Sequence, residues 1–177
     1  MITVKINLIT LIAAGALLTG CATGQSGITL DTVGPVPARL TTARSGNGVL
    51  VVYSAYKVNA DFNRPDPYRP EYSDYKICTA TGKLLQYVHN NSGTILQDPA
   101  SVELPPGEYR VKARANGYGI VVVPVVVERR QTTVVHLEGG GAWPDGSVFN
   151  QANAVRLPDG QVAGWRAAGE HFSDVKK

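Results

Sequence analysis

The sequence contains little of what metal or nucleophilic chemistry needs, with three histidines and two cysteines in 177 residues. His89, His136 and His171 form no H-x-x-x-H motif, and the two cysteines form no C-x-x-C motif, so local metal signatures are missing. The sequence also has no G-x-S-x-G nucleophile motif. It therefore predicts no catalytic residues, no metal site and no cofactor. Catalysis would require a site assembled entirely from distant residues.

Long helical patterns and a strong charge excess are also missing. No long stretch repeats apolar residues every 3.6 positions, so helices are expected to be scarce. The 17 basic and 14 acidic residues are dispersed along the chain. This distribution predicts neither nucleic acid nor an acidic polymer as a partner.

An apolar N-terminal segment has the layout of a secretory signal peptide over residues 1–20. Lys5 precedes the uncharged run Leu8–Leu18, and two small residues follow it. The run is too short to span a bilayer of about 30 Å as a helix. A buried core helix is the alternative, which the extreme N-terminal position disfavours.

The end of this segment, Leu18-Thr19-Gly20-Cys21, resembles the lipobox of bacterial lipoproteins. The resemblance implies cleavage between Gly20 and Cys21 and acylation of Cys21. Two or three acyl chains would then attach the protein durably to a membrane. Ala22, in a position where an Asp tends to retain lipoproteins at the inner membrane, implies the outer membrane, facing the periplasm or the cell surface.

Acylation of Cys21 would leave Cys78 without an intrachain partner, so no disulfide framework is expected. Cys78 lies in a strand-like run, and free cysteines are commonly packed. A quiet packed thiol is therefore predicted, rather than a reactive nucleophile.

The segment 21–48 is rich in Gly, Thr, Ser, Ala and Pro, which favours a flexible tether behind the anchor. Ile28–Val33 is compatible with a short strand. Apolar content rises at Val49–Tyr56, which predicts the first strand of a folded domain.

Two hairpin-like patterns follow. Asp74–Ala80 and Lys83–His89 read as strands joined by a tight turn at Thr81-Gly82. Later, Tyr109–Ala115 alternates apolar residues with cations, which places the cations on a solvated sheet face.

The run Ile120–Val127 is apolar enough for burial on both faces, but Pro124 cannot donate a ladder hydrogen bond, which predicts an edge strand or a bulge. Thr132–Leu137 is predicted as the last strand of the unit. Alternation along it predicts that His136 faces solvent.

The region 101–139 resembles the closing half of PEGA and carboxypeptidase-regulatory-like domains. The similarity is carried by Leu104-Pro105-Pro106-Gly107-Glu108-Tyr109-Arg110-Val111, Gly117-Tyr118, the valine-rich strand and Thr132–Leu137. It implies an all-β, prealbumin-like or Ig-like β-sandwich over 49–139, without catalytic residues of its own. The chain departs from this pattern where Arg129-Arg130-Gln131 replaces the usual glycine turn.

The segment 140–177 is predicted as a C-terminal extension with a hairpin around Pro158-Asp159-Gly160. Because two strands alone are marginally stable in water, the hairpin is expected to dock on the sandwich through Trp165 and Trp143. A disordered extension that meets a partner is the alternative.

Aromatic residues gather around the proline-rich loop 59–72, where Phe62, Tyr68, Arg69 and Tyr72 form a candidate binding loop. Rings beside charged groups are typical of protein, peptide or sugar contacts. Alternatively, these rings pack the loop onto the sandwich edge and protect it from strand addition.

Two functions remain open at this point. The first is a non-catalytic envelope lipoprotein whose sandwich is a structural or interaction module, with a membrane contact through its lipid and an envelope protein or glycan as partner. The second is a periplasmic hydrolase or accessory enzyme subunit. A concave pocket with convergent ionisable groups would favour the second, whereas a convex sandwich with exposed tyrosines would favour the first.

Overall fold

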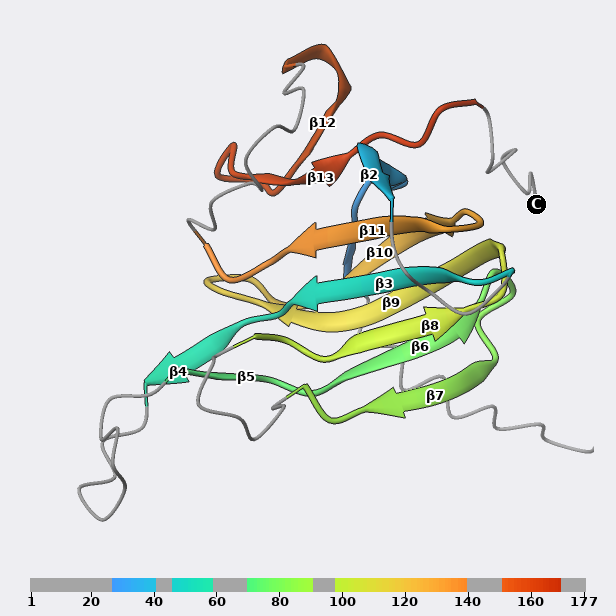
Figure 1. The fold of residues 1–177 in the computed structure, drawn as a ribbon. Helices are drawn as coiled ribbons and strands as arrows, with labels where there is room; N and C mark the ends of the chain where they lie inside the picture. Colours follow the sequence, from blue (N-terminus) through green and yellow to red (C-terminus); the bar gives the residue numbers. More distant parts are fainter. Residues whose placement is uncertain (1–26, 41–45, 59–69, 91–97, 140–150, 170–177) are drawn as a thin grey trace, which may run out of the picture.

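The computed structural model describes residues 27–40, 46–58, 70–90, 98–139 and 151–169, and more than half of these residues form strands (Figure 1). The elements are β1 (Ile28–Thr29), β2 (Pro35–Leu40), β3 (Gly48–Tyr53), β4 (Tyr56–Val58), β5 (Pro70–Tyr72), β6 (Tyr75–Thr79), β7 (Leu84–Val88), β8 (Ser101–Leu104), β9 (Gly107–Ala115), β10 (Gly119–Val127), β11 (Gln131–His136), the short 3-10 helix η1 (Gln151–Asn153), β12 (Ala154–Arg156) and β13 (Val162–Trp165).

Two larger sheets make up the body of the protein. One has the strand order β1-β10-β9-β6-β7, the other has the order β2-β11-β3-β8, and each of the pairs β4-β5 and β12-β13 forms a two-stranded ribbon. The prediction of an all-β sandwich is therefore confirmed. The two hairpins predicted at Thr81-Gly82 and Pro158-Asp159-Gly160 are also present, as β6–β7 and β12–β13.

The core lies between the two large sheets and consists mainly of valines. In β9, Val111, Ala113 and Ala115 are buried while the cations between them are exposed, as the alternation predicts. Leu50 and Val52 of β3 are fully buried in the same cluster. Removal of these side chains from water is the main stabilising contribution to such a fold.

Pro124 does not lie in an edge strand, because β1 pairs with β10 on the side away from β9. The Val33 N–H donates to the Pro124 carbonyl at 2.9 Å, and the Val126 N–H donates to the Val33 carbonyl at 2.8 Å. Since N and C=O of one strand residue point to the same side, the proline nitrogen faces this outer segment, where β1 has ended at Thr29. The missing N–H of Pro124 therefore lies on the side of the residues that follow β1, and the ladder is interrupted there rather than between β10 and β9.

Residues 27–40 belong to the sandwich, although the composition of 21–48 favours a tether. Leu30, Val33 and Val36 are buried, β1 pairs with β10, and β2 pairs with β11. A few apolar residues are sufficient to hold this segment on the sandwich, because its neighbouring strands β10 and β11 are rich in valine. The compatibility of Ile28–Val33 with a short strand is confirmed for β1 at Ile28–Thr29.

The turn between β10 and β11 contains the one non-glycine residue with positive φ in the described part of the chain. Arg130 has φ of 58°, and its N–H donates to the Asn47 carbonyl at 2.8 Å. Glycine adopts such a conformation more readily than a residue with a Cβ.

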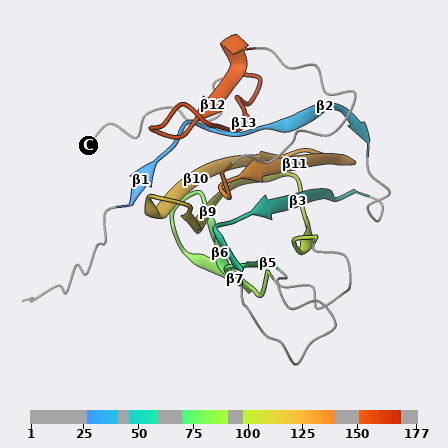
Figure 2. The same cartoon turned by 90° about the vertical axis from the view of Figure 1, so that its left-hand side faces the viewer.

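The C-terminal hairpin docks on the sandwich, as predicted. Trp165 is 2 % exposed and packs with Val36 and Val134. Figure 2 shows β2 and the β12–β13 hairpin on the same side of β11. Gly164 permits this approach, because a Cβ there would lie 2.6 Å from Val33 Cγ1. Trp143 lies outside the described residues.

Candidate functional site

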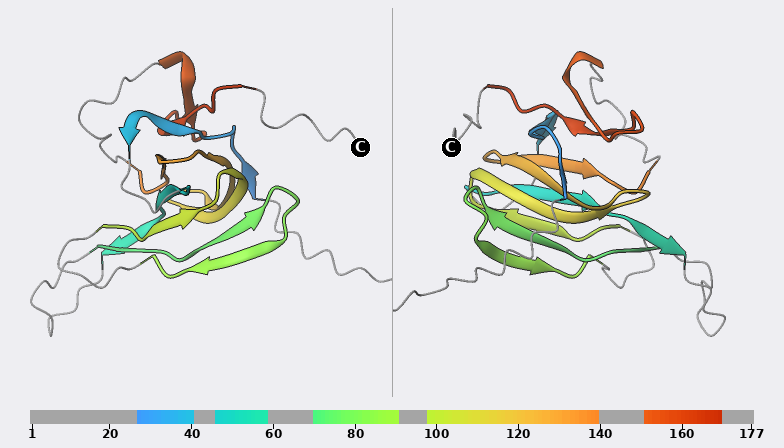
Figure 3. Two further views of the ribbon diagram at one scale, coloured as in Figure 1. Left: turned by 45° about the vertical axis from the view of Figure 1, so that its right-hand side comes forward. Right: turned by 180° about the vertical axis from the view of Figure 1, so that it is seen from behind.

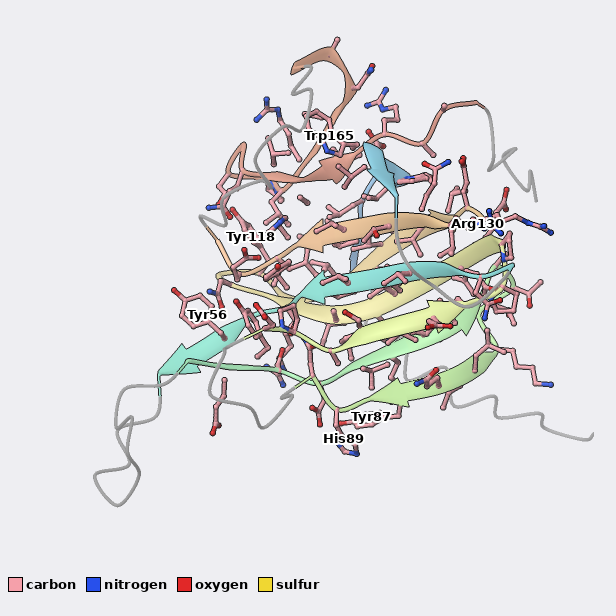
Figure 4. The ribbon with its side chains drawn as sticks, in the orientation of Figure 1. Tyr56, Tyr87, His89, Tyr118, Arg130 and Trp165 are labelled. Carbon is pink, nitrogen blue, oxygen red and sulfur yellow. The ribbon has the colours of Figure 1, made fainter. Side chains whose placement is uncertain are left out.

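A partly open pocket of about 530 Å³ lies where the β4–β5 ribbon leaves the sandwich. Its walls combine aromatic, acidic and basic side chains, contributed by Ala55, Tyr56, Glu71, Tyr72, Ser73, Asp74 and Arg114. Tyr56, labelled in Figure 4, is 39 % exposed.

Backbone pairing holds this pocket together. Tyr56 of β4 lies opposite Tyr72 of β5 in the ribbon. The Ala55 N–H donates to the Arg114 carbonyl and the Ser73 N–H donates to the Ala55 carbonyl, both at 2.8 Å. These two bonds fix the base of the ribbon to the end of β9.

The pocket tyrosines continue a row of rings that leads into the protein. The rings of Tyr56 and Tyr72 meet edge to face at 6.1 Å, and those of Tyr72 and Tyr53 at 5.7 Å. Tyr53 then stacks on His136 at 4.3 Å, with the ring planes 9° apart. The row thus joins the pocket to the covered outer face of β11.

The prediction that His136 faces solvent is wrong, because the side chain is only 5 % exposed. Its Nδ1 lies 2.6 Å from Glu138 Oε1, so the histidine forms a buried pair with a carboxylate. Alternation correctly places His136 on the outer face of β11 beside Val134, but Tyr53 and the docked hairpin cover that face.

Tyr72 keeps its proton at neutral pH. Burial, followed by the nearby Glu138 charge and the hydroxyls of Tyr53 and Tyr56, raises the pKa of Tyr72 to about 12. Its hydroxyl is therefore available to the pocket as a neutral hydrogen-bonding group.

Asp74, which also lines the pocket, is held as an anion. Partial burial would by itself raise the pKa of Asp74, but the Asn90 N–H, the Tyr87 hydroxyl and His89 bind the carboxylate and lower its pKa overall. The distances are 3.1 Å from Asn90 N to Oδ1, and 3.0 Å from Tyr87 and 3.1 Å from His89 to Oδ2. Figure 4 shows Tyr87 and His89 side by side near the lower edge of the sandwich.

Asn90 is fully buried, and its backbone N–H donates to the pocket residue Asp74. Its Nδ2 donates to the Val52 carbonyl at 2.8 Å and to Ser54 Oγ at 2.9 Å, and its Oδ1 accepts from the Ala100 N–H at 3.0 Å. Ser54 Oγ in turn donates to the Ser73 carbonyl at 2.5 Å. Through these hydrogen bonds Asn90 connects three separate segments of the chain.

Of the candidate binding loop, the structure places Tyr72, which lines the pocket. Phe62, Tyr68 and Arg69 lie outside the described residues, as do Gly20 and Cys21. The sequence analysis did not select Glu71 and Asp74, although both lie within two residues of Tyr72 in the chain. It also missed Arg114, since no local motif connects the end of β9 with the β4–β5 ribbon.

Cys78 is partly buried in β6, opposite Arg110 of β9. In the described part of the chain, no group of three His, Cys, Asp or Glu side chains could hold a metal ion. Within the same residues, no helix has the length and apolarity needed to cross a membrane.

Comparisons with family models, with curated proteins and with solved structures found no match for this chain.

Proposed function

We propose that the protein is an envelope lipoprotein whose β-sandwich is a non-catalytic interaction module, with the pocket between Tyr56, Tyr72, Asp74 and Arg114 as its contact site. The observation that carries this proposal is the pair of tyrosines in the pocket wall, of which Tyr56 is 39 % exposed, together with the charged residues Asp74 and Arg114 beside them. Such a mixture suits a sugar or a peptide, because rings provide flat contact area and the charged groups orient hydrogen bonds.

The ionisation of the pocket supports binding rather than acid–base chemistry. Tyr72 has a pKa of about 12, and hydrogen bonds lower the pKa of Asp74. General acids and bases work best with a pKa near the working pH, so neither group is tuned for proton transfer near neutrality. The alternative, a periplasmic hydrolase or accessory subunit, draws its support from the concavity and from Glu71 and Asp74 lying in the same pocket.

The resemblance to lipoproteins supplies the location. Acylation of Cys21 would place the sandwich at a bacterial membrane, most consistently the outer membrane, and an envelope protein or glycan is then the expected partner. The PEGA-like or carboxypeptidase-regulatory-like identity of the sandwich belongs to the same proposal.

The binding test compares the wild-type chain with the double variant Tyr56→Ala, Tyr72→Ala. Because even one aromatic anchor can contribute about 2 kcal/mol, retention on peptidoglycan or on cross-linked envelope partners should fall by about 30-fold or more. Leu85→Ala, an exposed truncation on β7, is the control and should retain wild-type binding. Equal retention by the double variant, with an unchanged circular dichroism spectrum, would refute the assigned contact site.

The anchor is tested with Cys21→Ser. The variant should leave the membrane fraction, and the wild-type mature chain should carry the mass of its acyl chains. A Cys21→Ser chain that still partitions with membranes would contradict the lipoprotein assignment.

A further inference from the structure

The outer face of the sheet β1-β10-β9-β6-β7 gathers cations that are dispersed in the sequence. Arg110, Lys112 and Arg114 alternate along β9 and are exposed, and Lys76 of the adjacent β6 is exposed as well. The register places Lys76 directly opposite Lys112. The strands β10, β9, β6 and β7 lie side by side (Figure 3). We call Lys76, Arg110, Lys112 and Arg114 the cationic face; Arg114 also lines the pocket, so the pocket lies at one end of this face.

This face has an excess of positive charge, because Arg110, Lys112 and Arg114 share the outer side of β9 with a single acidic residue, Glu108. None of its four cations forms an ion pair with another described residue. The ion pairs between described residues join His89 to Asp74, His136 to Glu138 and Arg166 to Asp31. Like charges directly opposite each other on neighbouring strands destabilise a sheet. The fold therefore maintains an unfavourable Lys76–Lys112 pair that an external anion would relieve.

An exposed aromatic ring borders the cations. Tyr87 of β7 lies opposite Lys76 in the register and is 48 % exposed. Tyrosine beside lysine and arginine is the composition that favours the interface between lipid headgroups and water.

The chain length between Cys21 and the sheet adds an argument for proximity to the membrane. Ile28 begins β1, the edge strand of this same sheet, and seven residue steps separate it from Cys21. A fully extended chain of that length reaches at most about 25 Å. If Cys21 is acylated, as the proposed function has it, this sheet edge stays within about 25 Å of the bilayer.

We propose that the cationic face docks on the surface of an anionic phospholipid bilayer, so that the lipid anchor and the face together orient the pocket. This inference rests on the lipid anchor of the proposed function for proximity and on the cationic face for orientation. Near an anionic surface each cation strengthens binding by about fivefold. Removing two of them should weaken docking by roughly 30-fold.

Cys78 provides the reporter, because it lies on the same outer face, opposite Arg110, and is partly accessible. The purified full chain is added to vesicles of phosphatidylglycerol and phosphatidylcholine in equal parts, to vesicles of phosphatidylcholine alone, and to detergent micelles. The rate at which iodoacetamide alkylates Cys78 is measured in each, and the ratio of vesicle rate to micelle rate is compared within each variant.

Docking predicts that alkylation slows at least fivefold on the anionic vesicles but not on phosphatidylcholine. Salt at about 1 M, which shortens the Debye length to about 3 Å, should restore the rate. Lys76→Gln with Lys112→Gln should also restore it. The matched control, Arg129→Gln with Arg130→Gln, removes two exposed cations from the β10–β11 turn and should leave the protection intact.

Equal rates on both kinds of vesicle would overturn the proposal, and so would protection that the Lys76→Gln, Lys112→Gln variant retains. Retention on DNA without slowing on anionic vesicles would assign the face to a soluble polyanion and would also overturn it. Acyl mass at Cys21 is measured on the same sample. A missing acyl mass contradicts the proposed function, whereas the alkylation ratio decides the cationic face in either case.

Discussion

At the scale of single residues, Tyr75 is buried at a cost. The side chain is 1 % exposed, and its hydroxyl has no hydrogen-bond partner among the described residues. An unsatisfied buried hydroxyl destabilises a fold by about 1–3 kcal/mol. Tyr75→Phe should therefore raise the free energy of unfolding by about 1 kcal/mol, measured by urea denaturation.

Tyr109→Phe is the matched control for that substitution. It removes a hydroxyl that donates to the Pro105 carbonyl at 2.8 Å, so it should leave stability unchanged or lower it by up to about 1 kcal/mol. A Tyr75→Phe protein less stable than wild type would show that the hydroxyl has a partner in solution.

The raised pKa values of Tyr75 and Tyr72 predict that the protein loses stability at alkaline pH. Burial raises the pKa of Tyr75 above its ordinary value of 10.0 and that of Tyr72 to about 12. Because the folded pKa values exceed the unfolded ones, the contribution is complete below pH 10 and is lost as pH rises toward 12. The urea midpoint should fall across this window, less steeply in Tyr75→Phe; a flat profile in the wild type would contradict the assignment.

Arg130 offers a second residue-scale test. Its φ of 58° is unfavourable for a residue with a Cβ. Arg130→Gly should raise the melting temperature by the equivalent of about 0.5 kcal/mol, since the strain relieved exceeds the extra backbone entropy of glycine in the unfolded chain. An unchanged or lower melting temperature would show that the turn carries no such strain.

At the scale of elements, the hairpin β12–β13 depends on its contact with the sandwich. Two isolated strands are marginal in water, and Trp165 provides the largest buried side chain at this contact. Trp165→Ala should lower the free energy of unfolding by about 3–5 kcal/mol and should make the segment 151–169 the first site of limited proteolysis. Val162→Ala, half-buried in the same strand, should have a much smaller effect. Unchanged protection in Trp165→Ala would mean that other contacts hold the hairpin.

Local sequence patterns were sufficient to predict the strands that pair with their immediate neighbours in the chain. The β6–β7 and β12–β13 hairpins follow from alternation and from turn residues such as Gly82 and Gly160, both of which adopt positive φ. The strand β2, by contrast, carries two prolines among its six residues, which disfavour a strand. Its place beside β11 depends on a partner far along the chain, so no window around it could reveal the pairing.

At the scale of the whole molecule, the cationic face makes stability depend on salt. Lys112→Gln should relieve the repulsion from Lys76 and raise the free energy of unfolding by about 0.5 kcal/mol at low ionic strength. The difference should vanish near 1 M salt, where charges more than about 3 Å apart are screened. A salt-independent difference would attribute the effect to packing rather than to charge.

The candidate site was predicted only in part. The concentration of tyrosines pointed to Tyr72, and the structure places that ring in the pocket beside Tyr56. Arg114 was correctly assigned to a solvated sheet face, but its position at the pocket could not be inferred, because the contact joins the end of β9 to a distant ribbon. Asn90 read only as a turn residue, yet it clamps three segments.

The sequence by itself determined the class of the fold and the two sides of alternating strands such as β9, because side-chain direction alternates with period two and turn chemistry acts over four residues. It did not determine which sides would be covered. His136 and Lys112 both lie on outer faces of their sheets, yet one is buried against Tyr53 and the other stands exposed opposite Lys76. Only the packing of distant segments decided between these outcomes, since burial and charge clustering depend on neighbours in space rather than along the chain.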